Sequence, residues 1–235
     1  MLRRPRHPGP RLDGRRLATT WQVVSLLLDY PTEELVGRRG VLEEAAAGLP
    51  VAVREPVCRF LGALGSVPLA QLQRDYVETF DVTRRCCLYL TYFAHGDTRK
   101  RGLALVQFKQ AYRKAGVELD AAELPDHLSV VLEFGAAYDA ETTWRLLNDH
   151  RSGVEMLRIA LSEKGSAWHD VLLALVATLP ELKGEDEEKV MALIAQGPPS
   201  EDVGLDLQPY AMDPRLNPRP SQSIELGATI EVGAP

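Results

Sequence analysis

Apolar residues recur along this chain at the three- and four-residue spacing of amphipathic helices. Strict alternation of apolar and polar residues, which marks half-buried strands, is almost absent from the same region. The spacing predicts about nine to ten helices, near 17–29, 32–47, 53–64, 69–80, 86–94, 98–115, 125–138, 141–164, 168–179 and from 185 onward. The pattern therefore indicates an all-α fold, a single-domain helical bundle.

The two ends of the chain lack this pattern. Residues 1–16 hold six Arg, one Asp and three Pro, and they are predicted to be a disordered basic arm. Residues 197–235 hold seven Pro and a formal charge of −4, and they are predicted to be a disordered, Pro-rich acidic tail. The helical domain is thereby assigned to residues 17–196.

Composition narrows the class of protein. The chain has 235 residues and a formal net charge of −6, which argues against a general nucleic-acid binder. Its three cysteines include no C-x-x-C pair, so neither a disulfide framework nor a zinc site is expected. The segment RRLATTWQVVSLLLDYP resembles a twin-arginine export signal, but its amphipathic spacing favours a first helix. We expect a cytoplasmic protein without direct membrane insertion.

The helix expected at 98–115 begins with three cations, Arg99, Lys100 and Arg101, at the end where the helix dipole disfavours them. Arg101 also heads an apolar face at i, i+4, i+7 and i+11 spacing, with Leu105, Phe108 and Tyr112. Two interpretations follow. Arg101 faces a ligand beside a hydrophobic groove, or it buries its stem and pairs with a carboxylate inside the fold. Asp97 would cap the helix and partly offset the cations.

The segment ELPDHLSVVLEF supplies further polar candidates. A helix opened by Pro125 would place His127 on an apolar face, and Asp126 and Glu133 elsewhere around the axis. This spacing does not bring two ligands to one metal, because metal-binding helices place them three or four residues apart. A metal site would need separate helices, and a helical metal-dependent hydrolase using His95, Asp97, His127 and Glu133 stays a possible alternative.

Two stretches, YVETFDVTRRCCLYLTYFAHGDTRKRG and ELPDHLSVVLEF, resemble the NarJ type of nitrate reductase assembly chaperone, also called the delta subunit. This type belongs to the TorD-like redox enzyme maturation proteins, and the resemblance extends over residues 17–180. It implies a TorD-like helical fold and a system-specific chaperone that is not an enzyme. Such proteins bind the immature catalytic (alpha) subunit of a respiratory nitrate reductase in the cytoplasm, including its N-terminal segment.

The resemblance also implies when the chaperone acts and which residues bind. It would permit insertion of molybdopterin guanine dinucleotide and an iron–sulfur cluster into the partner, delay membrane docking, and be absent from the final enzyme. It would hold no cofactor or metal of its own and have no catalytic residues. Arg101 is predicted to pair with Asp81 or Asp126. The predicted partner-peptide site comprises Tyr76, Phe80, Asp81, His95, Asp97, Arg101, Leu105, Phe108, Leu124, Asp126, His127 and Glu133.

Three other functions stay open at this point. The same fold could serve a different molybdoenzyme, of the dimethyl sulfoxide or trimethylamine oxide reductase type. The hydrolase described above would bind metal stoichiometrically. A nucleic-acid regulator would use the arginine-rich arm and show steep salt dependence. The sequence leaves open whether the protein is a monomer or a dimer.

Overall fold

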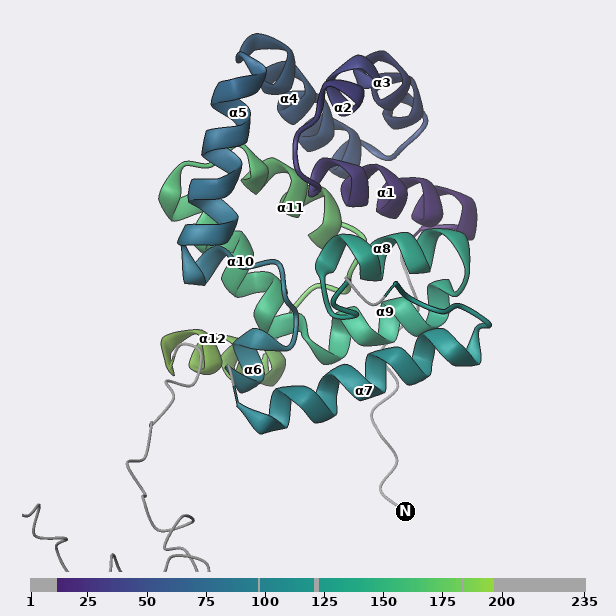
Figure 1. The fold of residues 1–235 in the computed structure, drawn as a ribbon, viewed down its shortest axis with the longest axis vertical. Helices are drawn as coiled ribbons and strands as arrows, with labels where there is room; N and C mark the ends of the chain where they lie inside the picture. Colours follow the sequence, from purple (N-terminus) through teal and green to yellow (C-terminus); the bar gives the residue numbers. More distant parts are fainter. Residues whose placement is uncertain (1–11, 97, 121–122, 183, 197–235) are drawn as a thin grey trace, which may run out of the picture. The chain divides into compact units, whose positions relative to one another are not determined.

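Helices α1 (Gly14–Leu27) and α8 (Leu128–Ala137) lie side by side, and three further helices pack against α1 (Figure 1). The computed structural model describes residues 12–96, 98–120, 123–182 and 184–196. Its helices are α1 (Gly14–Leu27), α2 (Glu33–Gly37), α3 (Arg39–Ala47), α4 (Val51–Ser66), α5 (Leu69–Tyr76), α6 (Tyr92–His95), α7 (Arg99–Lys114), α8 (Leu128–Ala137), α9 (Ala140–Asp149), α10 (Arg151–Lys164), α11 (Trp168–Val176) and α12 (Glu185–Gln196). A π-helix, η1 (Val77–Val82), and a 3-10 turn, η2 (Arg84–Cys86), follow α5. The described part of the chain contains no strand, which confirms the all-α prediction.

The core forms because α1 is apolar on several sides. Trp21 and Val24 are fully buried, and the Trp21 indole donates to Thr178 Oγ1 at 3.1 Å. Trp168 of α11 donates to the Leu27 carbonyl at 3.1 Å, which ties α11 to the end of α1. Both indole N–H groups are therefore satisfied inside the core, as buried tryptophans require.

One glycine sets how closely the central helices approach. A Cβ built on Gly135 of α8 would lie 2.6 Å from the Thr143 side chain and 2.7 Å from the Trp21 ring. Because real side chains do not tolerate such contacts, only glycine lets α1, α8 and α9 meet at this distance.

Several helix boundaries differ from the prediction. The first helix begins at Gly14, so the end of the segment assigned to a disordered arm is helical. The expected helices at 32–47 and 141–164 are each two helices, broken near Arg38 and His150, which gives twelve α-helices in the described residues instead of nine to ten. Residues 1–11 of the predicted basic arm and residues 197–235 of the predicted tail lie outside the described residues.

Two further predictions were wrong in the region of the motifs. The segment 86–94 is not one helix, since Cys86 ends a 3-10 turn, residues 87–89 are not helical, residues 90 and 91 form a turn, and an α-helix begins only at Tyr92. The helix expected from Pro125 begins at Leu128, and Pro125, Asp126 and His127 form the turn before it. These two segments pair with each other, which is why neither continues a helix.

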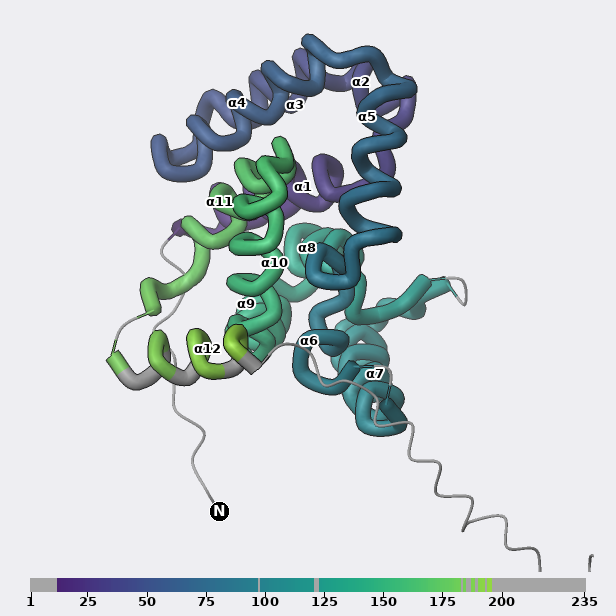
Figure 2. The backbone as a smooth tube through the Cα atoms, turned by 90° about the vertical axis from the view of Figure 1, so that its left-hand side faces the viewer, coloured from purple at the N-terminus to yellow at the C-terminus, as the bar shows by residue number. Residues whose placement is uncertain are grey.

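Helices α2, α3 and α4 gather at one end of the helical unit and α7 lies at the other, as Figures 1 and 2 both show. Helix α7 begins and ends close to its predicted bounds, and Gly116 follows it with a φ of +77°, a conformation suited to a glycine that ends a helix. Within the described residues, no helix is both long and apolar enough to cross a membrane.

Candidate partner-binding site

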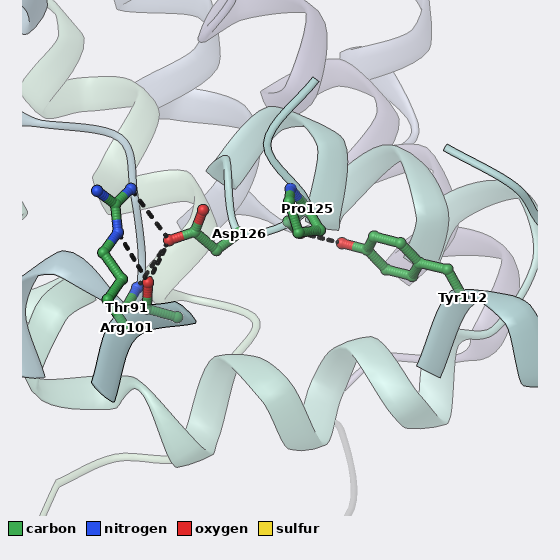
Figure 3. Close-up of polar contacts among 5 residues, drawn as sticks. All are labelled: Thr91, Arg101, Tyr112, Pro125 and Asp126. Carbon is green, nitrogen blue, oxygen red and sulfur yellow. Dashed lines mark hydrogen bonds and ion pairs between the residues drawn. The ribbon is translucent and has the colours of Figure 1, made fainter. Parts of the chain in front are cut away.

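Helix α7 holds the turn before α8 at two points (Figure 3). At one end of the helix, Arg101 approaches Asp126, with Nη2 3.8 Å from Oδ2. About three turns further along the same face, Tyr112 donates its hydroxyl to the Pro125 carbonyl at 2.5 Å. The helix face predicted from the sequence therefore exists, and its two polar residues, Arg101 and Tyr112, hold the turn before α8 in place.

Asp126 is the electrostatic centre of this arrangement. Its carboxylate is fully buried, and Oδ2 accepts hydrogen bonds from Thr91 N at 3.2 Å and Thr91 Oγ1 at 2.5 Å. Arg101 is 16% exposed and donates from Nε to Thr91 Oγ1 at 3.3 Å. The buried carboxylate explains how a cation is tolerated in the first turn of α7, because Asp126 compensates it from inside the fold.

The guanidinium of Arg101 also orders two aromatic rings. Its Cζ atom lies 5.2 Å from the ring centre of Tyr89 and 5.9 Å from that of Tyr92. Such contacts are attractive because the ring face is electron-rich. Arg101 thus helps to fix the position of the Tyr89 ring, which lines the neighbouring cavity.

Residues 88–90 pair with the turn before α8. Leu128 N donates to the Leu88 carbonyl at 2.8 Å, and Leu90 N donates to the Asp126 carbonyl at 3.0 Å. Tyr89 and His127 face each other in this short antiparallel bridge, with ring centres 5.3 Å apart. The two motifs singled out in the sequence are therefore joined by both backbone and side chains.

Beside this bridge lies a cavity of about 380 Å³ with an acidic lining. It is bounded by α1, the start of α8 and the segments that lead into α8. The carboxylates of Asp29, Glu123 and Glu133 line it, and no Lys or Arg is among the described residues that do so. Its full lining is Gln22, Ser25, Leu26, Asp29, Tyr89, Glu123, Leu124, His127, Ser129, Val130 and Glu133. The charge and polarity suit a positively charged group with hydrogen-bond donors.

His127 is one of the residues that line this cavity. Its Nδ1 lies 2.6 Å from Ser129 Oγ, and the Ser129 carbonyl accepts a hydrogen bond from Ser25 Oγ at 2.9 Å. Burial lowers the pKa of His127 below its ordinary value, against the opposing effect of nearby carboxylates led by Asp29. The imidazole is therefore neutral at pH 7, and it adds no positive charge to the acidic lining.

The structure divides the twelve predicted site residues into groups. Leu124, His127 and Glu133 line the acidic cavity, and Arg101 with Asp126 supports it from behind. Tyr76, Phe80 and Phe108 are core residues: the Tyr76 hydroxyl donates to the Leu28 carbonyl, and Phe80 packs on Trp168. Three others stand apart from the cavity lining, namely Asp81 (exposed), His95 (half-buried) and Leu105 (half-buried). Asp97 lies outside the described residues.

Sequence reasoning missed three important lining residues. Asp29 ends the first helical segment, Tyr89 was placed in a helix, and Glu123 precedes the L-P-D-H-L motif. Tyr89 lies inside the first of the two quoted stretches and Glu123 begins the second, whereas Asp29 lies in neither. Among the described residues, no group of three or more His, Cys, Asp or Glu side chains is arranged to hold a metal ion.

Comparison with known proteins identifies similar chains. The family model described as nitrate reductase delta subunit matches residues 46–174. The chain is 32% identical over 197 residues to the nitrate reductase molybdenum cofactor assembly chaperone NarJ of Escherichia coli (strain K12), covering 81% of this chain and 79% of that protein. It is 38% identical over 158 residues to the nitrate reductase-like protein NarX of Mycobacterium tuberculosis (strain H37Rv), covering 67% of this chain. That match spans only 24% of the NarX protein.

The fold has a counterpart among solved structures. A chain from Archaeoglobus fulgidus assigned to the redox enzyme maturation proteins superposes with a TM-score of 0.50 at 24% identity, covering 68% of this chain and 91% of that one. This likeness concerns the fold, and it agrees with the TorD-like bundle expected from the sequence.

Proposed function

The chain belongs to the nitrate reductase delta subunit family, and we propose that it is an assembly chaperone for the catalytic subunit of a respiratory nitrate reductase. The observation that carries this proposal is the acidic cavity framed by both sequence motifs. The named function of the NarJ relative supports it, since the match covers most of both chains. The name of that relative describes a chaperone, in keeping with the expectation that this chain is not an enzyme.

In this proposal the cavity receives a cationic side chain from the N-terminal segment of the immature catalytic subunit. Asp29, Glu123 and Glu133 supply negative charge from three separate segments of the chain, so they surround the bound group. Leu124 (40% exposed) and the Tyr89 ring offer apolar surface beside them for the neighbouring residues of the peptide. Charged contacts of this kind set specificity and association rate more than total affinity.

The timing of action follows from differential affinity. A chaperone that binds the N-terminal segment only while it is accessible favours the immature partner, and burial of the segment then releases the chaperone. Insertion of molybdopterin guanine dinucleotide and of the iron–sulfur cluster would take place while the partner is held, before it docks to the membrane subunit. The chaperone itself would contain no cofactor, would act in the cytoplasm and would be absent from the final enzyme.

The test is a calorimetric titration with a peptide from the N-terminus of the cognate catalytic subunit. The Asp29→Asn and Glu133→Gln variants remove one cavity charge each. We expect each to weaken binding about three- to tenfold, since a contact between charged groups at such a site contributes roughly 0.5–1.5 kcal/mol. Glu44→Gln, on the exposed face of α3, is the matched control and should leave affinity unchanged.

Two results would contradict the proposal. One is a peptide that fails to bind the wild-type protein. The other is binding that all three variants leave equally intact, because the partner would then occupy another surface. A peptide from a dimethyl sulfoxide reductase, tested in parallel, should bind more weakly if nitrate reductase is the partner.

A further inference from the structure

The outward side of α7 carries a run of cations, although the protein as a whole has an excess of negative charge. The helix contains no Asp or Glu, whereas the whole chain has a formal net charge of −6. Five of its cations are exposed, and none forms an ion pair among the described residues: Arg99, Lys100, Lys109, Arg113 and Lys114. Charges kept unpaired along 16 residues produce a local field opposite in sign to that of the rest of the molecule.

The fold does not use this side of the helix. The attachment of α7 to the bundle lies on its inner side, where Phe108 and Tyr112 are each 1% exposed and Ala104 is 8% exposed. The Tyr112 hydroxyl and Arg101 hold the turn before α8 from the same inner side. The exposed cations therefore have no role in packing α7.

Two aliphatic side chains stand among these cations. Leu103 is 70% exposed and Val106 is 48% exposed, one helical turn apart on the outward side. Arg99 lies one turn before Leu103, and Lys109 lies one turn after Val106. On an anionic membrane surface, Lys and Arg side chains meet the lipid headgroups, and aliphatic side chains beside them can enter the interface.

No other described helix covers the outward side of α7, so in the described part of the chain this surface is open to a flat partner. Both views place α7 at one end of the described helical unit, away from α2, α3 and α4 (Figures 1 and 2). At 1.5 Å per residue its 16 residues extend over about 24 Å, enough for all five cations to approach one plane from the outer side.

We propose that the outward side of α7 docks reversibly on an anionic lipid bilayer surface. Duplex nucleic acid is the other polyanion that five cations could meet, but it offers no environment for Leu103 and Val106. Docking of this kind is peripheral, is weakened by salt, and would bring a chaperone with its bound partner to the membrane without a spanning segment. It is independent of the acidic cavity, which lies behind the inner side of α7.

The test is co-sedimentation of the full chain with vesicles of phosphatidylglycerol and phosphatidylcholine, compared with vesicles of phosphatidylcholine alone. The Lys109→Glu/Arg113→Glu variant reverses two outward charges and should lower the partition coefficient at least about tenfold. Arg74→Glu/Arg84→Glu, with two exposed cations outside α7, is the matched charge control and should leave partition within about twofold of wild type. The arginines of residues 1–11 are present in every variant, so only the difference between variants counts.

A second pair of variants tests the aliphatic contribution. Leu103→Ser should lower partition about threefold or more, while Val41→Ser, at a valine of similar exposure (68%) on α3, should have no effect. Equal partition of the two charge variants, binding to neutral vesicles as strong as to anionic ones, or tighter binding to a labelled DNA duplex would each overturn the proposal. Peptide affinity of the α7 variant should stay at the wild-type value, which also shows that the variant is folded.

Discussion

Removing the buried carboxylate of Asp126 should cost more stability than removing any exposed acid of the same motifs. In Asp126→Ala, Thr91 loses the acceptor of two hydrogen bonds, of 3.2 and 2.5 Å, and Arg101 loses an ionic partner at 3.8 Å. Breaking one side of a buried ionic pair costs about 3–5 kcal/mol. That is a large share of the roughly 5–15 kcal/mol that stabilises a typical domain.

The Asp126→Asn variant removes the negative charge of the side chain and keeps its size and shape. The amide oxygen can still accept from Thr91, but the amide nitrogen would occupy the place of Oδ1, which is buried and has no hydrogen-bond partner among the described residues. A buried donor left unsatisfied costs about 1–3 kcal/mol, so this variant should lie between wild type and Asp126→Ala.

Urea unfolding followed by circular dichroism measures both variants. Asp81→Asn is the control, because Asp81 belongs to the same motifs yet is exposed, and its change should stay within about 0.5 kcal/mol. If Asp81→Asn cost as much as Asp126→Asn, or if Asp126→Ala unfolded at the wild-type midpoint, Asp126 could not be the carboxylate that compensates Arg101.

Three more predictions concern packing, hydrogen bonding and pH. Gly135→Ala should lower the free energy of unfolding by about 1–3 kcal/mol, since its Cβ would meet a threonine side chain at 2.6 Å. Gly62→Ala, with open space around it, should be neutral or stabilising. Tyr112→Phe should cost about 1–2 kcal/mol through its buried hydroxyl, while Tyr138→Phe, 64% exposed, should cost nothing measurable in the same assay. Burial lowers the pKa of His127 in the folded protein, so the unfolded chain binds a proton at this residue more readily. The free energy of unfolding should therefore fall as the pH drops from about 6.5 through the lower folded pKa. Urea unfolding at pH 7.5 and at pH 5.5 should show a smaller difference in His127→Gln than in the wild type.

Periodicity predicted the fold where one helix face decides burial. The α7 stripe is correct because Phe108 and Tyr112 satisfy a single apolar face, and the terminal glycine marks the end of the helix. Periodicity failed at His150, where the apolar pattern continues but the chain bends, with His150 Nδ1 2.9 Å from the Leu146 carbonyl. A break of that kind depends on local hydrogen bonding and leaves the hydrophobic spacing unchanged.

The site was harder to predict because its walls come from distant segments. Tyr89 is held in an extended conformation by backbone bonds of its neighbours to Asp126 and Leu128, contacts that no local propensity encodes. Asp29 joins the cavity only because α1 packs on α8. Pro125 favoured a helix start by local rules, and the pairing of the following residues with residues 88–90 prevailed over that preference.

The charges of the two motifs have separate roles, which the sequence alone could not distinguish. Arg101 and Asp126 offset each other inside the fold, so the pair adds little net charge to the cavity, whose field comes from Asp29, Glu123 and Glu133. A substitution at Arg101 should therefore act on peptide binding through the position of Tyr89 and through stability. A substitution at Glu133, which is exposed, should change affinity and leave the unfolding midpoint in place. Peptide affinity and the free energy of unfolding should therefore be measured for a substitution at Arg101 and for one at Glu133. A residue that shapes the site should change both quantities, whereas a residue that only contacts the partner should change affinity alone.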